Sequence, residues 1–496
     1  MADPLYRYLE GLNPGSEVLL SRQLHEKLKL AISTGDLKNG TKLPAIRTLA
    51  SQFGWGRNAV DTAYSWLESD GLVQQFRGKG TFVVGGEADA PTAAGEPGRP
   101  HDDRAAISFY ASRPSELLFP LDEFRATCRE VIDSPEAAHI LQLGAPAGYE
   151  PLRQSILQVS REQGVAGDND DVLVTSGCQQ GFDLLARVYG SNGETVLIED
   201  PVYPGLRDAF QRAGARVLGL PLGVPLGGER GPMNVAALRR MLEKEHPRLL
   251  VLTPSFQNPT GLSLTEEARR KVLDLVAHAA RKFGTILVEN DLYSLLQYHG
   301  APLARMKAMD RTGQTLLLTS FSKIAFPGLR VGWMIGPRET IARLVEAKYV
   351  CDLHTDQLSQ AVVLQFARSG RLVAHLNKMV EVCRERLDVC LEACHKEFPA
   401  GVEYTIPLGG MNVWVRLPFH LDASVLAVRA SNQGVSFMAG KYFAVSRSHK
   451  NELRLSFAGL EPEQIRKGIE ILGRIFKMEM DAPRNGSRLE PAAAVV

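Results

Sequence analysis

The segment from Ser320 to Arg330 holds the side chains best suited to chemistry in this chain of 496 residues. It reads Ser-Phe-Ser-Lys-Ile-Ala-Phe-Pro-Gly-Leu-Arg, so Lys323 has hydroxyl groups beside it and an arginine seven residues later. A lysine amine can hold an aldehyde as a Schiff base, and an arginine fork binds phosphate. These residue types at this spacing predict a covalent site for pyridoxal 5'-phosphate.

Small residues between a predicted strand and a predicted helix form a second candidate site. The sequence at 176–180 is Ser-Gly-Cys-Gln-Gln and directly follows an apolar run. Backbone N–H groups at the start of a helix attract anions, and small side chains let the anion approach them. We therefore expect Gly177, Cys178 and Gln179 to cradle a phosphate group.

The elements that must position these residues follow an alternating pattern. Buried-looking runs at 171–175, 195–198, 249–252 and 285–288 are separated by helical segments. This alternation predicts an α/β fold with a mostly parallel sheet. Ligands gather at the carboxyl ends of the strands in such sheets, and the polar motifs follow the runs directly.

The first eighty or so residues have a different pattern. Apolar residues at helical spacing predict a helix that ends near Thr34, a second that starts at Pro44 and is closed by Gly54, and a third over 57–69. Two apolar runs then flank a Gly-rich turn near residue 78, which predicts a two-stranded wing. Together these elements predict a winged helix-turn-helix, a fold that binds DNA.

Composition divides the chain into parts. Residues 85–106 are rich in Pro, Gly, Ala and charge and lack large apolar side chains, so they are predicted to form a flexible linker. The linker separates a DNA-binding domain at 15–84 from an α/β domain at 107–478. Residues 479–496 share the character of the linker and are predicted to be a disordered tail.

The charge balance and the cysteines limit the partners. With 57 Lys and Arg against 56 Asp and Glu, the chain has no bulk charge that indicates nucleic acid or a membrane. Residues 15–86 nevertheless hold nine basic and six acidic residues, a local net charge of +3 that favours DNA. Apolar runs of membrane-spanning length are absent, so we expect a cytoplasmic protein without a membrane partner. Six cysteines without CxxC spacing predict neither a disulfide framework nor a metal site.

Three motifs in the first domain resemble the signatures of GntR-type DNA-binding domains. They are Leu-Pro-Ala-Ile-Arg at 43–47, Gly-Arg-Asn-Ala-Val at 56–60 and Gly-Lys-Gly-Thr-Phe-Val at 78–83. The resemblance implies that the third helix enters the major groove and that these residues contact DNA: Arg47, Arg57, Asn58, Arg77 and Lys79. Gly56 and Ala59 replace the usual Ser and Thr, which predicts altered affinity or site preference. A winged helix used for protein contacts is the alternative.

The region 107–478 resembles fold-type I aminotransferases, with a smaller C-terminal α/β part, and the tandem arrangement resembles the MocR subfamily of GntR regulators. The resemblance assigns the following roles. Lys323 holds pyridoxal 5'-phosphate, and Ser320 and Arg330 bind its phosphate, with Ser322 a further cofactor-binding residue. Tyr203 stacks on its ring, Asn258 and Tyr293 donate to its phenolic oxygen, and Arg454 grips an amino acid carboxylate. Alternative roles are a core tyrosine for Tyr203 and an edge-strand charge for Arg454.

Two departures from the family bear on chemistry. The carboxylate that normally faces the ring nitrogen lies three residues before the tyrosine, and that position here is Asn290, with Asp291 next to it. An asparagine would not hold the pyridine nitrogen protonated, and Asp291 could substitute only if the strand end were shifted. Leu143 stands where aminotransferases place a tyrosine that reaches the partner subunit's phosphate. Both changes favour sensing over turnover.

These observations predict a homodimeric transcriptional regulator that binds a double-stranded DNA operator, and hence the nucleoid, and senses the cofactor or a small amino compound. The alternative is an active aminotransferase with an appended DNA-binding module, so enzymatic activity is left open as residual transamination. A structural DNA protein with a vestigial domain is disfavoured because so many polar ligand positions remain.

Overall fold

The computed structural model divides the chain into two compact units, residues 1–96 and 97–496, and each is described by itself. The structure describes residues 9, 12, 20–33, 36–37, 40–69, 72–76, 80–83, 105–223 and 234–481. Within these ranges, no helix is long and apolar enough to cross a membrane.

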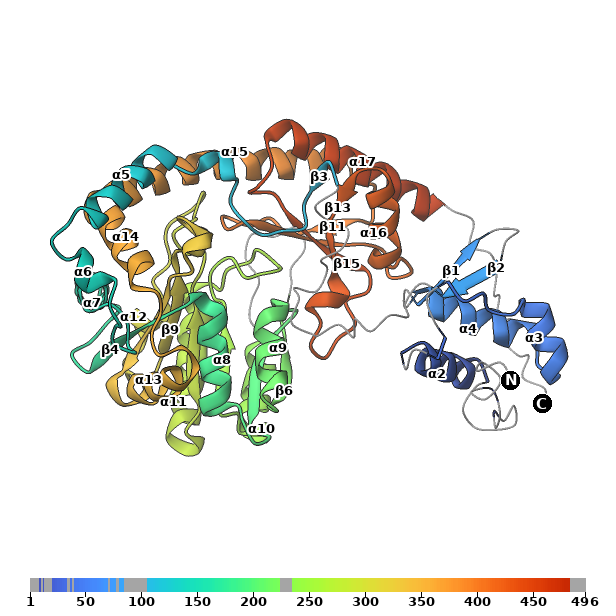
Figure 1. Cartoon of the computed structure of the whole chain (residues 1–496), viewed down its shortest axis with the longest axis horizontal. Coiled ribbons are helices and arrows are strands. Elements are labelled where there is room, and N and C mark those ends of the chain that lie inside the picture. Colours follow the sequence, from blue (N-terminus) through green and yellow to red (C-terminus); the bar gives the residue numbers. More distant parts are fainter. Residues whose placement is uncertain are drawn as a thin grey trace. The chain divides into compact units, whose positions relative to one another are not determined.

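Among the described elements of the first unit are the three helices and the two-stranded antiparallel wing that the sequence predicts (Figure 1). Apolar side chains from all three helices, including Leu28, Leu49 and Val60, form one buried cluster with the wing. The second helix ends at Gly54, whose left-handed backbone (φ 67°) glycine adopts readily. The elements are α2 (Leu20–Ser33), α3 (Ile46–Phe53), α4 (Arg57–Ser69), β1 (Val73–Phe76) and β2 (Gly80–Val83).

A seven-stranded sheet forms the centre of the second unit, in the order β4-β10-β9-β8-β7-β5-β6. Strand β10 runs antiparallel to both neighbours, and the other pairs in the sheet are parallel. The predicted mostly parallel sheet is therefore confirmed. The strands are β4 (Asp170–Thr175), β5 (Thr195–Asp200), β6 (Arg216–Pro221), β7 (Leu249–Leu252), β8 (Ile286–Asn290), β9 (Leu316–Ser320) and β10 (Gly332–Pro337).

Helices bury both faces of this sheet, which explains why its strands are nearly continuous apolar runs. On one face, Leu184 and Leu344 pack on alternate strand residues such as Val251. On the other, Leu238 and Val272 pack on the strand residues between them. The first face is covered by α8 (Gly177–Tyr189), α9 (Pro204–Arg212) and α13 (Arg338–Asp352), and the second by α10 (Val235–Glu245) and α11 (Glu266–Phe283).

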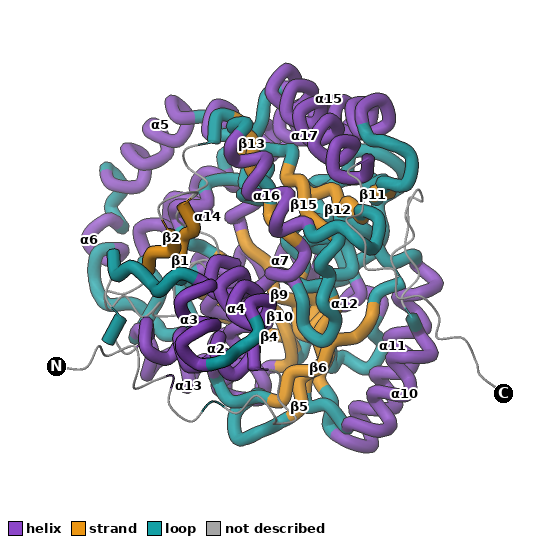
Figure 2. Tube along the Cα trace, turned by 90° about the vertical axis from the view of Figure 1, so that its right-hand side faces the viewer, coloured by secondary structure: helices purple, strands orange, loops and turns teal. Residues whose placement is uncertain are grey.

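A smaller antiparallel sheet, ordered β11-β12-β15-β14, lies in the C-terminal part of this unit. Helices α15 and α17 lie side by side beside it (Figures 1 and 2), and α15 buries Cys383, Cys390 and Cys394. The elements are β11 (Glu403–Tyr404), β12 (Asn412–Arg416), β14 (Met438–Ala439), β15 (Glu452–Ser456), α15 (Arg371–Glu397), α16 (Ala423–Asn432) and α17 (Pro462–Asp481). Because α17 continues to residue 481, the first three residues of the predicted tail are helical.

Strand β3 (Ile107–Ser108), at the start of the α/β unit, pairs in parallel with β13 (Val435–Ser436) near its end. The remaining elements connect the two sheets or cover their edges. They are η1 (Glu116–Leu118), α5 (Leu121–Ile132), α6 (Ala137–Ile140), α7 (Glu150–Glu162), α12 (Met306–Met309), η2 (Phe321–Lys323), η3 (Pro327–Leu329), α14 (Gln357–Arg368) and η4 (Gly440–Phe443).

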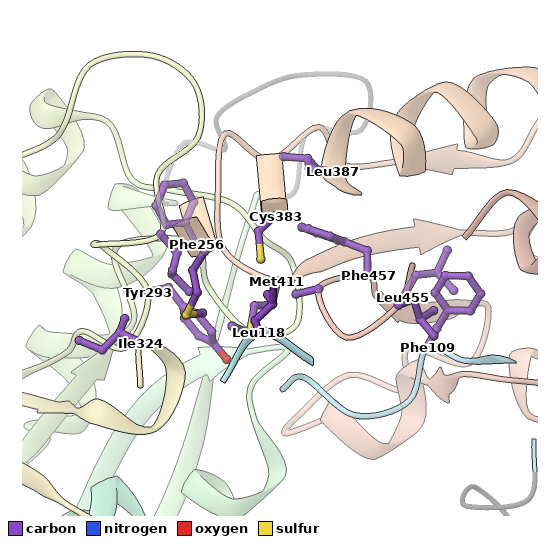
Figure 3. Close-up of a cluster of buried hydrophobic side chains, with 14 of the residues drawn as sticks. Phe109, Leu118, Phe256, Tyr293, Ile324, Cys383, Leu387, Met411, Leu455 and Phe457 are labelled. Carbon is purple, nitrogen blue, oxygen red and sulfur yellow. The ribbon is translucent and has the colours of Figure 1, made fainter. Parts of the chain in front are cut away.

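Apolar side chains from distant parts of the chain meet between the two sheets (Figure 3). Tyr293, Phe256 and Met411 lie close together there, with Cys383 of α15 beside them. A side chain on Gly410 would come within 2.6 Å of Phe256, so glycine allows this close packing. The packing fixes the Tyr293 ring while its hydroxyl group stays at the edge of the cluster.

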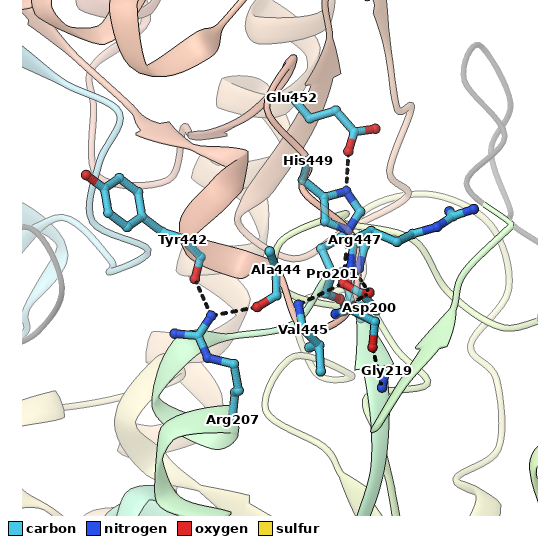
Figure 4. A network of polar contacts seen from close by, with 12 residues as sticks. Asp200, Pro201, Arg207, Gly219, Tyr442, Ala444, Val445, Arg447, His449 and Glu452 are labelled. Atoms are coloured by element: carbon cyan, nitrogen blue, oxygen red, sulfur yellow. Dashed lines mark hydrogen bonds and ion pairs between the residues drawn. The ribbon is translucent and has the colours of Figure 1, made fainter. Parts of the chain in front are cut away.

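A buried polar network also joins the two sheets (Figure 4). Asp200, the last residue of β5, accepts hydrogen bonds from the backbone N–H groups of residues 445–447 and lies 2.9 Å from His449 Nε2. The other nitrogen of His449 pairs with Glu452 of β15. Burial alone would lower the pKa of His449, but the two carboxylates outweigh it and raise the pKa to about 9.

The raised pKa predicts a loss of stability at alkaline pH. The charged His449 stabilises the fold fully below its unfolded pKa of 6.5, and this contribution is lost as the pH rises through about 9. At about 1.36 kcal/mol per pKa unit, this contribution to the free energy of unfolding is on the order of 3 kcal/mol. Denaturant unfolding between pH 7 and 10 should show the loss in the wild type and a flatter profile in His449→Gln. The exposed control His395→Gln should retain the wild-type slope, and equal slopes in all three proteins would contradict the assignment.

Candidate functional site

A short arc after β9 brings Lys323 and Arg330 to the carboxyl end of that strand. The chain forms η2 and η3 and returns along β10, and Arg330 closes the arc with a left-handed backbone (φ 55°). Ser320 Oγ lies 2.9 Å from the Val331 carbonyl oxygen and 2.8 Å from Ser322 Oγ, so this hydroxyl fixes the arc. Arg330 Nη1 donates to Ser322 Oγ at 3.5 Å, so it is the Ser322 hydroxyl that contacts the guanidinium.

The start of α8 meets Arg330. Arg330 Nη2 donates to the Ser176 carbonyl at 3.2 Å, and a Cβ atom on Gly177 would overlap the Arg330 guanidinium. Gly177 also has a φ of 74°, a conformation that favours glycine. A guanidinium beside the N-terminus of a 13-residue helix is a positively charged cradle that suits a phosphate group.

Two residues predicted to cradle the phosphate have their side chains elsewhere. Cys178 is buried, and burial raises its pKa to about 12 although Arg330 and Lys323 oppose the shift, so the thiol stays neutral. Gln179 Nε2 donates to the Gly205 carbonyl at 2.9 Å. Both residues can therefore offer only their backbone N–H groups to an anion.

Tyr203 lies at the start of α9 and is 38% exposed, so the alternative of a core tyrosine is wrong. A Cβ atom on Gly205 would lie 2.6 Å from the Tyr203 ring. The ring therefore lies against the first turn of α9 and remains partly exposed.

The segment 110–112 links the remaining predicted residues. Lys323 Nζ donates to the Ser112 carbonyl, and Ser112 Oγ lies 3.4 Å from the Tyr293 hydroxyl. Arg454 donates to the Tyr110 carbonyl and, at 3.0 Å, to Asn258 Oδ1. The structure therefore gathers residues that are more than 300 positions apart in the sequence.

Arg454 is only 4% exposed, and its guanidinium lies 4.9 Å from the Phe443 ring. It belongs to β15, which has β12 on one side and β14 on the other. The alternative of a charge on an edge strand is therefore wrong. A buried guanidinium beside Asn258 can bind a carboxylate with two parallel hydrogen bonds.

Asn290 and Asp291 have separate environments. Asn290 Nδ2 donates to Thr253 Oγ1 at 3.1 Å, and its buried Oδ1 has no hydrogen-bond partner among the residues that the structure describes. The Asp291 carboxylate accepts hydrogen bonds from Arg305 and Ser294. Asp291 is thus held in an ion pair and does not take the place of Asn290.

The sequence did not single out residues 110–112, Thr253 or Glu199, which line or support this cluster. No motif marks them, because their role depends on which distant residues the fold places beside them. Leu143, where the family has a tyrosine, is 79% exposed.

The predicted DNA-contacting residues that the structure describes are exposed. Arg47 lies on α3, and Arg57 and Asn58 begin α4, the helix predicted to enter the major groove. Arg77 and Lys79 lie outside the described residues. A Cβ atom on Gly56 would meet nothing within 4 Å, so the fold does not require glycine there.

Two family models match the chain. Residues 119–472 match aminotransferase class I and II, and residues 20–83 match bacterial regulatory proteins of the gntR family. The chain therefore belongs to the aminotransferase class I and II family. With the gntR-family domain in front, it has the domain organisation of MocR-type transcriptional regulators.

Relatives match either the α/β unit or nearly the whole chain. The 2-aminoadipate transaminase of Thermus thermophilus is 37% identical over 75% of this chain and 90% of its own length. The probable rhizopine catabolism regulatory protein MocR of Rhizobium meliloti is 28% identical over 94% and 95%. Among solved structures, Pyrococcus horikoshii kynurenine aminotransferase in complex with PMP has a TM-score of 0.71 at 32% identity, covering 76% of this chain and 92% of that one.

The contact between Gly177 and Arg330 predicts the effect of a single methyl group. Gly177→Ala places a Cβ atom against the guanidinium and strains a positive φ, so it should weaken binding of pyridoxal 5'-phosphate about tenfold or more, or about 1.4 kcal/mol. Absorbance titration measures the affinity. Gly328→Ala, two residues from Arg330 with open space around it, is the control. Equal affinities of the two variants would remove this contact from the phosphate site.

Arg57 and Lys79 should affect DNA binding differently. If Arg57 reads a base edge, Arg57→Ala should cost about 1–3 kcal/mol of operator binding and relax discrimination at one base pair. Lys79→Ala should weaken all sequences alike and lower the salt slope by about one. Fluorescence anisotropy with operator and scrambled DNA measures both effects. Equal, sequence-independent losses would exclude Arg57 from base reading.

Proposed function

We propose that this MocR-type regulator binds pyridoxal 5'-phosphate through Lys323 and that the cofactor, or an amino compound that reacts with it, changes its affinity for a DNA operator. The proposal rests on a cluster of polar side chains that distant segments bring together. They are Lys323, Arg330, Asn258, Tyr293 and Arg454. A protein that bound only DNA would have no use for such a cluster of polar side chains.

The residues present fit the cofactor. When bound, pyridoxal 5'-phosphate supplies an aldehyde that condenses with amines and a ring that withdraws electrons. Arg330 and the N-terminus of α8 would hold its phosphate, and Tyr203 would cover its ring. Asn258 and Tyr293 would donate hydrogen bonds to its phenolic oxygen.

Arg454 would recognise the carboxylate of an amino compound. Its present partners are the Tyr110 carbonyl and Asn258, neutral oxygens that a carboxylate could replace. Replacing them would release the Tyr110 carbonyl from Arg454 of the small sheet. Ligand binding would thereby alter the contacts of a segment that lies close to the end of the linker.

A homodimer is the assembly that suits this function. Two winged helices would read two half-sites of an operator, and the symmetry of the protein would match that of the DNA. The cytoplasm, where DNA and cofactor are both present, is the proposed location.

The second candidate function is an active aminotransferase, which the 37% identity to a 2-aminoadipate transaminase favours. Asn290 favours the sensor, because an amide carries no charge to hold the ring nitrogen protonated as a carboxylate would.

Lys323→Ala tests the proposed cofactor binding, and operator affinity and oxo acid formation measured beside it separate the two functions. The wild type should absorb visible light and retain the cofactor covalently after borohydride treatment, whereas Lys323→Ala should do neither. Operator affinity should respond to pyridoxal 5'-phosphate or to a member of an amino acid panel in the wild type alone. The exposed control Lys378→Ala should behave like the wild type.

Oxo acid formation is measured in the same samples. Turnover at about 1 s⁻¹ or faster, within the usual range of enzymes, would favour the aminotransferase over the sensor. A wild type that stays colourless with excess cofactor would overturn the proposed cofactor binding altogether.

A further inference from the structure

A chain of hydrogen bonds links the end of α13 to the cradle formed by Arg330 and the start of α8. Gln180 Oε1 accepts the Ser176 N–H at 2.7 Å, and Gln180 Nε2 donates to Asp352 Oδ2 at 2.6 Å. The other oxygen of Asp352 accepts from Lys348 Nζ, also at 2.6 Å. Gln180 belongs to the first turn of α8, and Asp352 is the last residue of α13. The two helices are therefore joined at the residue that precedes the cradle.

The backbone of Ser176 is held at both of its polar groups. Its N–H donates to Gln180, and its carbonyl oxygen accepts from Arg330 Nη2 at 3.2 Å. Ser176 is the N-cap residue of α8, yet its side chain makes no capping hydrogen bond to the first turn that the structure describes. Gln180 satisfies the N–H of the N-cap residue instead, as the later residue of a capping box does. The N–H groups of residues 177–179, which have no partner within a helix, are thus left for an anion.

The Gln180 amide is satisfied in one orientation only. The Ser176 N–H requires an acceptor, and the Asp352 carboxylate requires a donor. If the amide turned over, it would set a donor against the Ser176 N–H and an acceptor against the carboxylate. The orientation of the Ser176 peptide group therefore depends on Asp352, although Asp352 does not contact Ser176 directly.

Lys348 anchors this chain of hydrogen bonds. Its side chain is 0% exposed, whereas that of Asp352 is 29% exposed. Burial lowers the pKa of Lys348, although the hydrogen bond with Asp352 opposes the shift. An ion pair that removes a charge from water adds little net stability, so the geometry that it fixes is the better explanation for it. The pair also neutralises a carboxylate that would otherwise repel a phosphate group.

We propose that Gln180 is a positioning residue for the phosphate group of pyridoxal 5'-phosphate: it holds the Ser176 peptide group so that the N–H groups of residues 177–179 face the phosphate. The Lys348–Asp352 pair holds Gln180 in place. The inference rests on the proposed binding of pyridoxal 5'-phosphate. Gln180 acts through Ser176, because both ends of its amide are already bonded to Ser176 and Asp352.

Pyridoxal, which lacks the phosphate group, separates the contribution of this group from that of the rest of the site. Absorbance titration of the full-length protein gives the dissociation constants of pyridoxal 5'-phosphate and of pyridoxal, and their ratio is compared between variants. Gln180→Met, which is similar in length and has no amide, should weaken binding of pyridoxal 5'-phosphate about three- to tenfold, as expected for one lost hydrogen bond. The affinity of this variant for pyridoxal should remain that of the wild type.

Lys348→Met tests the anchor of the chain. It frees the Asp352 carboxylate from its counter-charge, and both consequences, a less fixed Gln180 and a repelling carboxylate, weaken phosphate binding. The ratio should therefore shift in the same direction as in Gln180→Met, again with an unchanged affinity for pyridoxal.

Asp183→Asn is the matched control. Asp183 lies on the same helix, three residues after Gln180, and pairs with Arg187 at 2.7 Å. Its side chain is 44% exposed, and the pair does not include a residue of the chain that leads to Ser176. Loss of this ion pair should leave the ratio of the two dissociation constants unchanged.

The outcomes are distinct. A wild type that binds neither ligand overturns the proposed function, whereas a wild type that prefers pyridoxal 5'-phosphate, with the same ratio in Gln180→Met, overturns the positioning role alone. Equal losses of both affinities in Gln180→Met also overturn this role, because they would reflect damage to the whole site. A shift of the same size in Asp183→Asn has the same meaning. If Gln180→Met fails to fold, Lys348→Met decides, and a wild-type ratio in that variant contradicts the proposal.

Discussion

The approach of Arg330 to the backbone of Gly177 is the constraint on which the rest of the site depends. The arc after β9 and the first turn of α8 come from strands that β10 separates, and they can meet only where side chains are missing. Gly332 repeats the requirement, because a Cβ atom on it would lie 2.9 Å from Gly177 Cα. This close approach fixes the distance between the anion cradle and Lys323, and therefore the length of ligand that can reach both.

Local patterns made much of this structure predictable. The helix expected over 57–69 is α4 with the same bounds. The arc from Ser320 to Arg330 turns at Pro327 and Gly328, as that dipeptide predicts. These features depend on neighbours in the chain, so hydrophobic spacing and turn residues specify them. The family resemblance added Asn258 and Arg454 as separate residues, but their contact at 3.0 Å appears only in the fold.

The parts that the sequence could not supply depend on burial and on long-range register. Glu199 lies four residues before Tyr203, yet only the order of β5, β7 and β8 reveals that it and Asn290 both contact Thr253. His449 is an ordinary histidine in the sequence, and its raised pKa results from Glu452 together with Asp200, which lies nearly 250 residues away. The sequence does not reveal side-chain direction either, since Gln179 Nε2 bonds to the Gly205 carbonyl and not toward the predicted phosphate site.

The parallel pairing of β3 with β13 has a mechanical consequence. Residues 107–108 pair with β13, and Tyr110 and Ser112, whose carbonyl groups accept hydrogen bonds from Arg454 and Lys323, follow two and four residues after Ser108. The peptide chain that leaves this strand in the other direction leads to the DNA-binding domain. A displacement of segment 110–112 would therefore act first on the β3–β13 pair, and the residues that precede β3 in the sequence connect that pair covalently to the gntR-family domain.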